Sequence, residues 1–167
     1  MEFLSRLQLY FRGEKTESAV LLVVSLGLLA GAALLAFWVR QPFTRGLGAV
    51  LLLAGLIGVT VAGTVFFRTD AQVAKLGALY ESSRAEFAQI EGGRMDKVVT
   101  SFRFYRFMYI LAGVAGVLLV SLTARPALHG AAVGLFLFAA MGFTIDHYAE
   151  ERAKWYAAEV HAQGAPD

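Results

Sequence analysis

The chain is organised around its polar centre, residues 68–106, which reads RTDAQVAKLGALYESSRAEFAQIEGGRMDKVVTSFRFYR. This is the only long polar segment inside the chain, and a pair of apolar segments lies on each side of it. Residues 18–39 and 46–67 precede it, and residues 107–124 and 128–145 follow it. The centre is therefore the place where the chain leaves one apolar pair before it enters the next.

Each apolar segment is long enough to cross a lipid bilayer. A hydrocarbon core about 30 Å thick needs roughly 20 residues of helix, because backbone groups find no water there and must bond one another. No ionisable side chain occurs between Ala19 and Val39 or between Gly46 and Phe67. A soluble four-helix bundle would keep a polar face on each helix, and the first two segments have none.

We therefore predict an all-α, polytopic membrane protein of one domain, residues 1–167. It has four transmembrane helices in two hairpins, with long cytoplasmic helical extensions. The composition agrees, because 17% of the residues are charged, against about 25% in soluble domains. The chain contains no cysteine, which excludes disulfide and thiolate chemistry.

Positive charge predicts the orientation. All but three of the 15 Lys and Arg residues lie in the amino-terminal segment, the polar centre or the carboxyl-terminal segment. The three exceptions, Arg40, Arg45 and Arg125, lie in the short turns within the two apolar pairs. Because cytoplasmic loops of membrane proteins are enriched in Lys and Arg, we expect both termini in the cytoplasm and the chain in the cytoplasmic (inner) membrane.

Helical patterns continue outside the apolar segments. Residues 1–12 have apolar residues at helical spacing, which predicts either an interfacial helix on the membrane or an extension packed on neighbouring helices. Gly13 is expected to end this helix. A long helix from Gly46 is expected to end at Gly92 and Gly93, so that residues 68–106 form a cytoplasmic helical hairpin. Residues 146–163 are expected to form one further cytoplasmic helical extension.

An apolar seam runs along the polar centre. Its members follow the alternating spacing of three and four residues that is typical of a coiled coil. They are Val73, Leu76, Tyr80, Phe87 and Ile90. Because water would otherwise reach these side chains, we predict that they contact a protein partner or a second copy of the chain.

Two arginines, Arg103 and Arg106, alternate with aromatic residues where the polar centre meets the third apolar segment. Arginine side chains at such a place reach lipid head groups while the rings lie at the interface. The two arginines therefore predict either an ordinary anchor at the membrane surface or a specific site for a lipid head group. The same mixture does not indicate nucleic-acid binding, because it lies at a membrane boundary.

A polar cluster follows the fourth apolar segment, formed by Asp146, His147, Glu150 and Glu151. On a helix these carboxylate and imidazole groups share a face, so they could bind a transition metal or relay a proton. One helix supplies too few ligands, and a solvated helix start is the simpler explanation of the cluster. No cofactor is expected, and no nucleophile with a base, phosphate loop or zinc motif appears.

The sequence therefore predicts a non-enzymatic protein whose spans anchor a cytoplasmic stalk for protein or self association. One alternative is an oligomeric channel or holin-like pore lined by Thr60, Thr64 and Ser121. A second alternative is a membrane immunity protein that blocks a toxin.

A weak internal repeat is also visible. Pro42 and Gly46 are matched by Pro126 and Gly130, and residues 71–75 resemble residues 149–154 with one insertion. Since both halves would run from inside to outside and back, a duplication would have parallel topology. Short apolar hairpins also resemble one another by composition alone.

Overall fold

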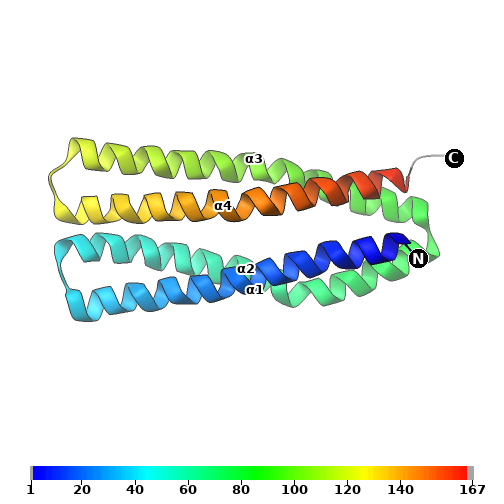
Figure 1. Cartoon of the computed structure of the whole chain (residues 1–167), viewed down its shortest axis with the longest axis horizontal. Coiled ribbons are helices and arrows are strands. Elements are labelled where there is room, and N and C mark those ends of the chain that lie inside the picture. Colours follow the sequence, from blue (N-terminus) through cyan, green and yellow to red (C-terminus); the bar gives the residue numbers. More distant parts are fainter. Residues whose placement is uncertain (1, 165–167) are drawn as a thin grey trace.

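The computed structural model describes residues 2–164 as four long helices joined by short connections (Figure 1). Consecutive helices run in opposite directions, and no strand occurs within residues 2–164. The elements are α1 (Glu2–Leu34), the π-helix η1 (Leu35–Val39), α2 (Pro42–Ser82), α3 (Arg84–Leu122) and α4 (Pro126–Ala162). The predicted all-α class is confirmed, and all four helices are long and apolar enough to cross a membrane.

The molecule has an apolar half and a polar half, which lie at opposite ends of the elongated bundle (Figure 1). The apolar half comprises residues 18–67 and 107–145. The polar half comprises residues 2–17, 68–106 and 146–164, so each of the four helices contributes to both halves. The sequence had predicted polar extensions from three helices.

The polar half is held together by a cluster of buried side chains from all four helices. Its members are Phe3, Leu7, Tyr10, Phe11, Leu76, Tyr80, Phe87, Met95, Ala153, Tyr156, Ala157 and Val160. Aromatic rings contribute directly: Tyr10 stacks on Tyr156 with ring centroids 4.1 Å apart, and Phe3 stacks on Tyr80 at 4.7 Å. Residues 2–12 are thus an extension packed on neighbouring helices.

In the apolar half, in contrast to the polar half, the large apolar side chains point outward from the helices. Val23 is 70% exposed and Leu53 is 60% exposed. The helices of this half meet through small residues instead. A Cβ at Gly46 would overlap the carbonyl oxygen of Ala127, and a Cβ at Gly130 would overlap that of Phe43. Only glycine allows α2 and α4 to approach so closely.

These contacts relate the first helix pair, α1 and α2, to the second pair, α3 and α4, by a constant offset in the sequence. Gly46 and Gly130 are 84 positions apart, and each lies against the residue that follows the proline of the other helix. The same offset of 84 positions relates the α1–α2 contact of Ser25 with Gly58 to the α3–α4 contact of Tyr109 with Gly142.

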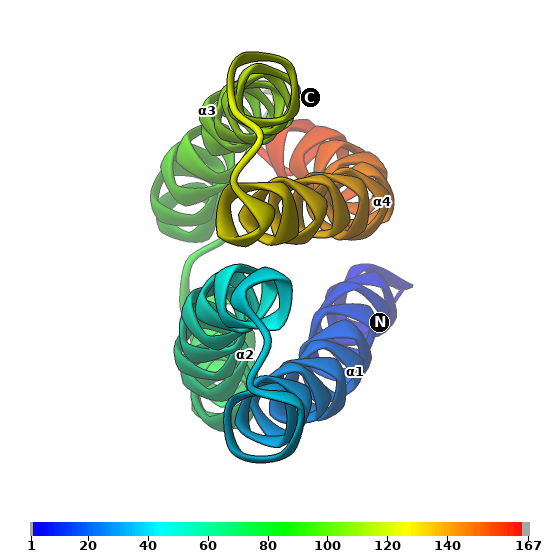
Figure 2. The ribbon, with the colours of Figure 1, turned by 90° about the vertical axis from the view of Figure 1, so that its left-hand side faces the viewer.

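A Cβ on Gly58 would overlap Ser25, and a Cβ on Gly142 would overlap Tyr109. Buried positions of the polar half obey the same rule, since Phe3 corresponds to Phe87. Figure 2 shows the two helix pairs from the end that carries the connections after η1 and α3. The geometry supports the parallel duplication, but in this register residue 71 corresponds to residue 155, so the predicted match of residues 71–75 with 149–154 is wrong.

Two predicted helix ends are also wrong. Gly13 lies inside α1, where a Cβ would come within 2.9 Å of Cδ of Arg152. Gly92 lies inside α3, where a Cβ would come within 3.2 Å of the His161 ring. Both glycines admit a neighbouring side chain instead of ending a helix.

The turn between the long helices occurs at Ser83. Its backbone is extended, with φ −156° and ψ 104°, and its hydroxyl oxygen accepts a hydrogen bond from the backbone N–H of Glu86 at 3.3 Å. Serine is a preferred residue at this capping position, because its side chain satisfies a backbone donor in the first turn. A local cap therefore ends α2 nine residues before the predicted glycine pair.

Candidate functional site

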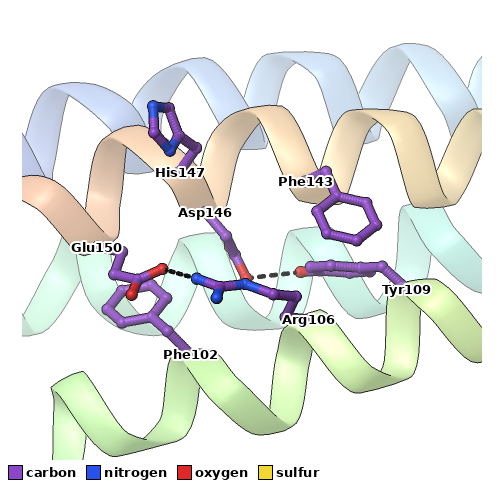
Figure 3. Close-up of a pocket in the computed structure, with 7 residues that line it drawn as sticks. All are labelled: Phe102, Arg106, Tyr109, Phe143, Asp146, His147 and Glu150. Carbon is purple, nitrogen blue, oxygen red and sulfur yellow. Dashed lines mark hydrogen bonds and ion pairs between the residues drawn. The ribbon is translucent and has the colours of Figure 1, made fainter.

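A pocket of about 310 Å³ lies between α3 and α4 where the apolar half meets the polar half (Figure 3). Its walls combine aromatic rings with charged groups. The lining residues are Phe102, Arg106 and Tyr109 from α3, and Phe143, Asp146, His147 and Glu150 from α4. These positions recur every three or four residues, so each set shares one face of its helix.

Hydrogen bonds join the two helices across the pocket. Arg106 forms an ion pair with Glu150 through Nη2 and Oε2, and the Tyr109 hydroxyl donates to Oδ2 of Asp146 at 2.9 Å. Figure 3 shows both links side by side, with His147 directed away from them. The pocket thus holds one guanidinium and two carboxylates within reach of one another.

The two carboxylates are held differently. Glu150 has two cationic partners, because its Oε1 also lies 2.9 Å from Nζ of Lys154. The hydrogen bond from Lys154, followed by Arg106, lowers the pKa of Glu150. Asp146 makes no ion pair with any residue in the described range 2–164. Burial therefore raises the pKa of Asp146, although the hydrogen bond from Tyr109 opposes this effect.

The internal repeat provides a comparison for this pocket. At the seven equivalent positions, 84 residues earlier, the first helix pair carries no charged residue. These positions are Ser18, Leu22, Ser25, Val59, Ala62, Gly63 and Phe66. The first helix pair therefore packs at these positions without charged groups, and Arg106, Asp146 and Glu150 distinguish the second pair from it.

Of the polar cluster and the two arginines singled out in the sequence, some line the pocket and the others lie outside it. Asp146, His147 and Glu150 line the pocket, together with Arg106 from the predicted head-group pair. Glu151 instead forms an ion pair with Lys154 at 3.0 Å, and Arg103 is exposed outside the pocket. Among residues 2–164, no three His, Asp or Glu side chains are grouped closely enough to hold a metal ion.

Sequence reasoning missed Phe102, Tyr109 and Phe143 as members of the site. Their helical spacing from Arg106 and Asp146 was visible, but the pairing of α3 with α4 in this register was not. The contact of Tyr109 with Gly142 sets that register, because a larger residue at position 142 would displace the ring.

The predicted partner-contact residues lie largely inside the chain. Leu76, Tyr80 and Phe87 are buried, and Val73 packs against the same core. Residues of α1 and α4 pack over this seam, so Leu76, Tyr80 and Phe87 are at most 8% exposed in the single chain, and Val73 is partly buried. Ile90, at 53% exposure, is the predicted contact residue that stays on the surface.

The predicted pore-lining hydroxyls lie on the outside of the single chain. Thr60, Thr64 and Ser121 are exposed. Thr60 donates to the Leu56 carbonyl at 2.8 Å and Thr64 donates to the Thr60 carbonyl at 2.7 Å, so both hydroxyls are satisfied within α2. A pore lined by these groups would require several copies of the chain.

A second group of charges is buried within the polar half. Glu91 is fully buried and accepts two hydrogen bonds from Arg94, at 2.7 and 2.6 Å. Glu14 lies near this pair, but its Oε2 has no hydrogen-bond partner. Arg152 pairs with Glu17 and connects α4 to α1. The Arg152–Glu17 pair therefore links two helices that are far apart in the sequence, whereas Glu91 and Arg94 lie one turn apart on α3.

Comparisons with known protein families, with characterised proteins and with solved structures find no match to this chain.

Proposed function

We propose that this protein is a non-enzymatic membrane anchor, in which two transmembrane hairpins hold a cytoplasmic four-helix bundle that associates with protein. The observation that carries the proposal is the opposite packing of the two halves. Large apolar side chains cover the outside of the apolar half, while the polar half contains a core of buried apolar side chains from all four helices. Outward apolar side chains are stable in lipid and costly in water.

The positions of exposed aromatic residues support insertion. Trp38 and Phe67 are each 80% exposed and lie near the two ends of the apolar half. Aromatic residues are enriched at both membrane–water interfaces. Along α2, Phe43 and Phe67 are separated by about 36 Å at roughly 1.5 Å per residue, which fits a hydrocarbon core of about 30 Å with its interfaces.

Ion pairs support a polar half that lies in water next to the membrane. Lys15 of α1 lies 2.5 Å from Asp70 of α2; Lys15 comes just before the apolar part of its helix and Asp70 just after the apolar part of its own. The excess of Lys and Arg on this side supports a cytoplasmic location. Association would then involve the outer surface of the polar half, where Ile90 is exposed.

Single-cysteine labelling tests the arrangement, because the natural chain has no cysteine. Ser82→Cys places a thiol at the turn of the polar half, and Ala124→Cys places one at the opposite end; both positions are exposed. An impermeant maleimide added to intact cells should label Ala124→Cys, and Ser82→Cys only after the membrane is opened.

Labelling of Ser82→Cys in intact cells would contradict the proposed orientation. Release of the chain from membranes by alkaline carbonate would contradict insertion altogether. Neither substitution touches the core of the polar half, so each variant should fold as the natural chain does.

A further inference from the structure

We propose that the pocket between α3 and α4 binds the head group of phosphatidylethanolamine, with Asp146 receiving the ammonium group and Arg106 receiving the phosphate. The inference rests on the membrane insertion proposed above, and it assigns a ligand to one site of the inserted protein. Three observations carry it: the position of the pocket, the state of its charges and the absence of those charges from the equivalent site.

The position suits a lipid head group. The pocket begins at Phe143 and Tyr109, at the end of the apolar half that adjoins the polar half, and extends to Glu150 in the polar half. If the apolar half spans the bilayer, the charged groups lie at the depth of phosphate and amine groups. Its volume of about 310 Å³ lies at the lower end of the usual range of ligand sites, about 300–1,000 Å³, and fits a small head group.

The charges suit a zwitterion. Asp146 is half-buried and has a hydrogen bond from Tyr109, but it has no cationic partner in residues 2–164. A buried carboxylate is stabilised when a cation is supplied to it. A primary ammonium group supplies that charge together with three N–H donors.

Arg106 can turn to a phosphate without leaving Glu150 unpaired. Glu150 has Lys154 as its second partner, at 2.9 Å, so that ion pair persists when the guanidinium moves. Guanidinium groups bind phosphate oxygens with two parallel hydrogen bonds. The bound state would then contain Arg106 with phosphate, Lys154 with Glu150 and ammonium with Asp146, so every charge has a partner.

This arrangement distinguishes among phospholipids. Phosphatidylcholine carries a quaternary ammonium, which has no N–H donor for Asp146. Phosphatidylglycerol has a phosphate for Arg106 but no cation, so Asp146 would stay unpaired next to a second negative charge. The first helix pair, with Leu22 and Ala62 at the positions of Arg106 and Asp146, should show no such selectivity.

Native mass spectrometry of the full chain in detergent tests the proposal. The protein is titrated with phosphatidylethanolamine, phosphatidylcholine or phosphatidylglycerol of identical acyl chains, and the bound lipids are counted. We expect phosphatidylethanolamine to bind about tenfold more tightly than phosphatidylcholine, the effect of one charge-assisted hydrogen bond.

Variants identify the groups responsible. Asp146→Asn should remove the difference between phosphatidylethanolamine and phosphatidylcholine, and Arg106→Gln should weaken both lipids. Arg103→Gln is the matched control, because Arg103 lies one turn away on α3 but outside the pocket. Asp146→Ala introduces the residue that the first helix pair carries at the equivalent position, Ala62, and should also remove the preference, so a second variant tests Asp146 if Asp146→Asn fails to fold.

Equal binding of the three lipids, or an equal loss in Arg103→Gln and Arg106→Gln, would overturn the proposal. Soluble glycerophosphoethanolamine provides a further arm: if it competes as well as the lipid at equal concentration, the site is for a free compound and the lipid assignment is wrong. Insertion is measured separately by reconstitution into nanodiscs. A chain that inserts but shows no preference refutes this inference alone, and a chain that does not insert refutes the proposed function.

Discussion

Glu14 is a buried carboxyl group whose charge is only partly compensated. Its Oε2 has no hydrogen-bond partner, and its nearest ion pair, with Arg68, has a separation of 4.0 Å. Burial raises the pKa of Glu14 above its ordinary value, although Arg94, Arg68 and Arg152 oppose the shift. The folded protein therefore binds a proton at this position more tightly than the unfolded chain does.

A pH dependence of stability follows. Below the unfolded pKa, about 4.3 for glutamate, Glu14 is protonated in both states. As the pH rises through that value toward the raised folded pKa, the unfolded state releases its proton first and the free energy of unfolding decreases. Glu14→Gln stays neutral, so it should raise the unfolding temperature at pH 7 and have little effect below pH ~4.

Thermal unfolding monitored by tryptophan fluorescence checks this prediction. Glu81→Gln is the control, because Glu81 is exposed and its loss should change the unfolding temperature little at either pH. A Glu14→Gln protein that unfolds at a lower temperature than the natural chain at pH 7 would show that the charged carboxylate stabilises the fold.

Among the helices, the close approach of α2 and α4 depends on two glycines. Gly46 and Gly130 each face a backbone carbonyl of the other helix, which cannot move aside as a flexible side chain can. Gly63 also lies in α2, but a Cβ there would meet no atom within 4 Å. Substitutions at Gly46 and Gly130 therefore test the close helix contact, and a substitution at Gly63 measures the general effect of replacing a glycine within a helix.

Gly46→Ala and Gly130→Ala should each lower the free energy of unfolding by about 1–3 kcal/mol, as overpacked sites do. Gly63→Ala should leave it unchanged or raise it slightly, because alanine favours helix. Thermal unfolding in one detergent compares the variants. Equal effects at Gly46 and Gly63 would indicate that α2 and α4 do not meet at this contact.

At the scale of the whole molecule, the burial of the seam changes what a substitution there should do. Leu76 and Phe87 belong to the core that joins all four helices, so Leu76→Asp with Phe87→Asp would bury two charges without partners. We expect this double variant to unfold the polar half while the apolar half stays in the membrane. From the seam pattern in the sequence alone, the same double variant is expected to lose its assembly but to keep its membrane insertion.

Ile90→Arg provides the contrasting variant, because Ile90 is on the surface. It should leave the polar half folded and reduce any association through that surface. Limited proteolysis reports the fold of the polar half, and light scattering in detergent reports the assembly size relative to the 18.1 kDa chain. A double variant that resists proteolysis as the natural chain does would contradict the buried seam.

Much of the fold could be predicted because it depends on local composition. Runs without charge mark the four apolar segments, and Pro42 and Pro126 start the helices that follow the two short connections. The glycines were harder to interpret. Gly13 and Gly92 resemble helix ends in the sequence, but their function is to admit Arg152 and His161 from another helix.

The candidate site could be predicted only in part. Asp146, His147 and Glu150 were recognised on their own helix, and Arg106 was recognised on another as part of a different site. These residues line one pocket because of the register between α3 and α4, and the residue pattern within a single helix carries no information about that register.

The sequence by itself determined that this is an all-helical chain with four apolar segments and one charged side, since helix formation and partition into lipid depend on each segment alone. The tertiary structure decided that the seam is covered by α1 and α4, that Gly46 meets Ala127, and that Arg106 and Asp146 line one pocket. The physical reason is that burial and pairing are properties of two surfaces in contact, and the contacting residues lie tens of positions apart in the chain.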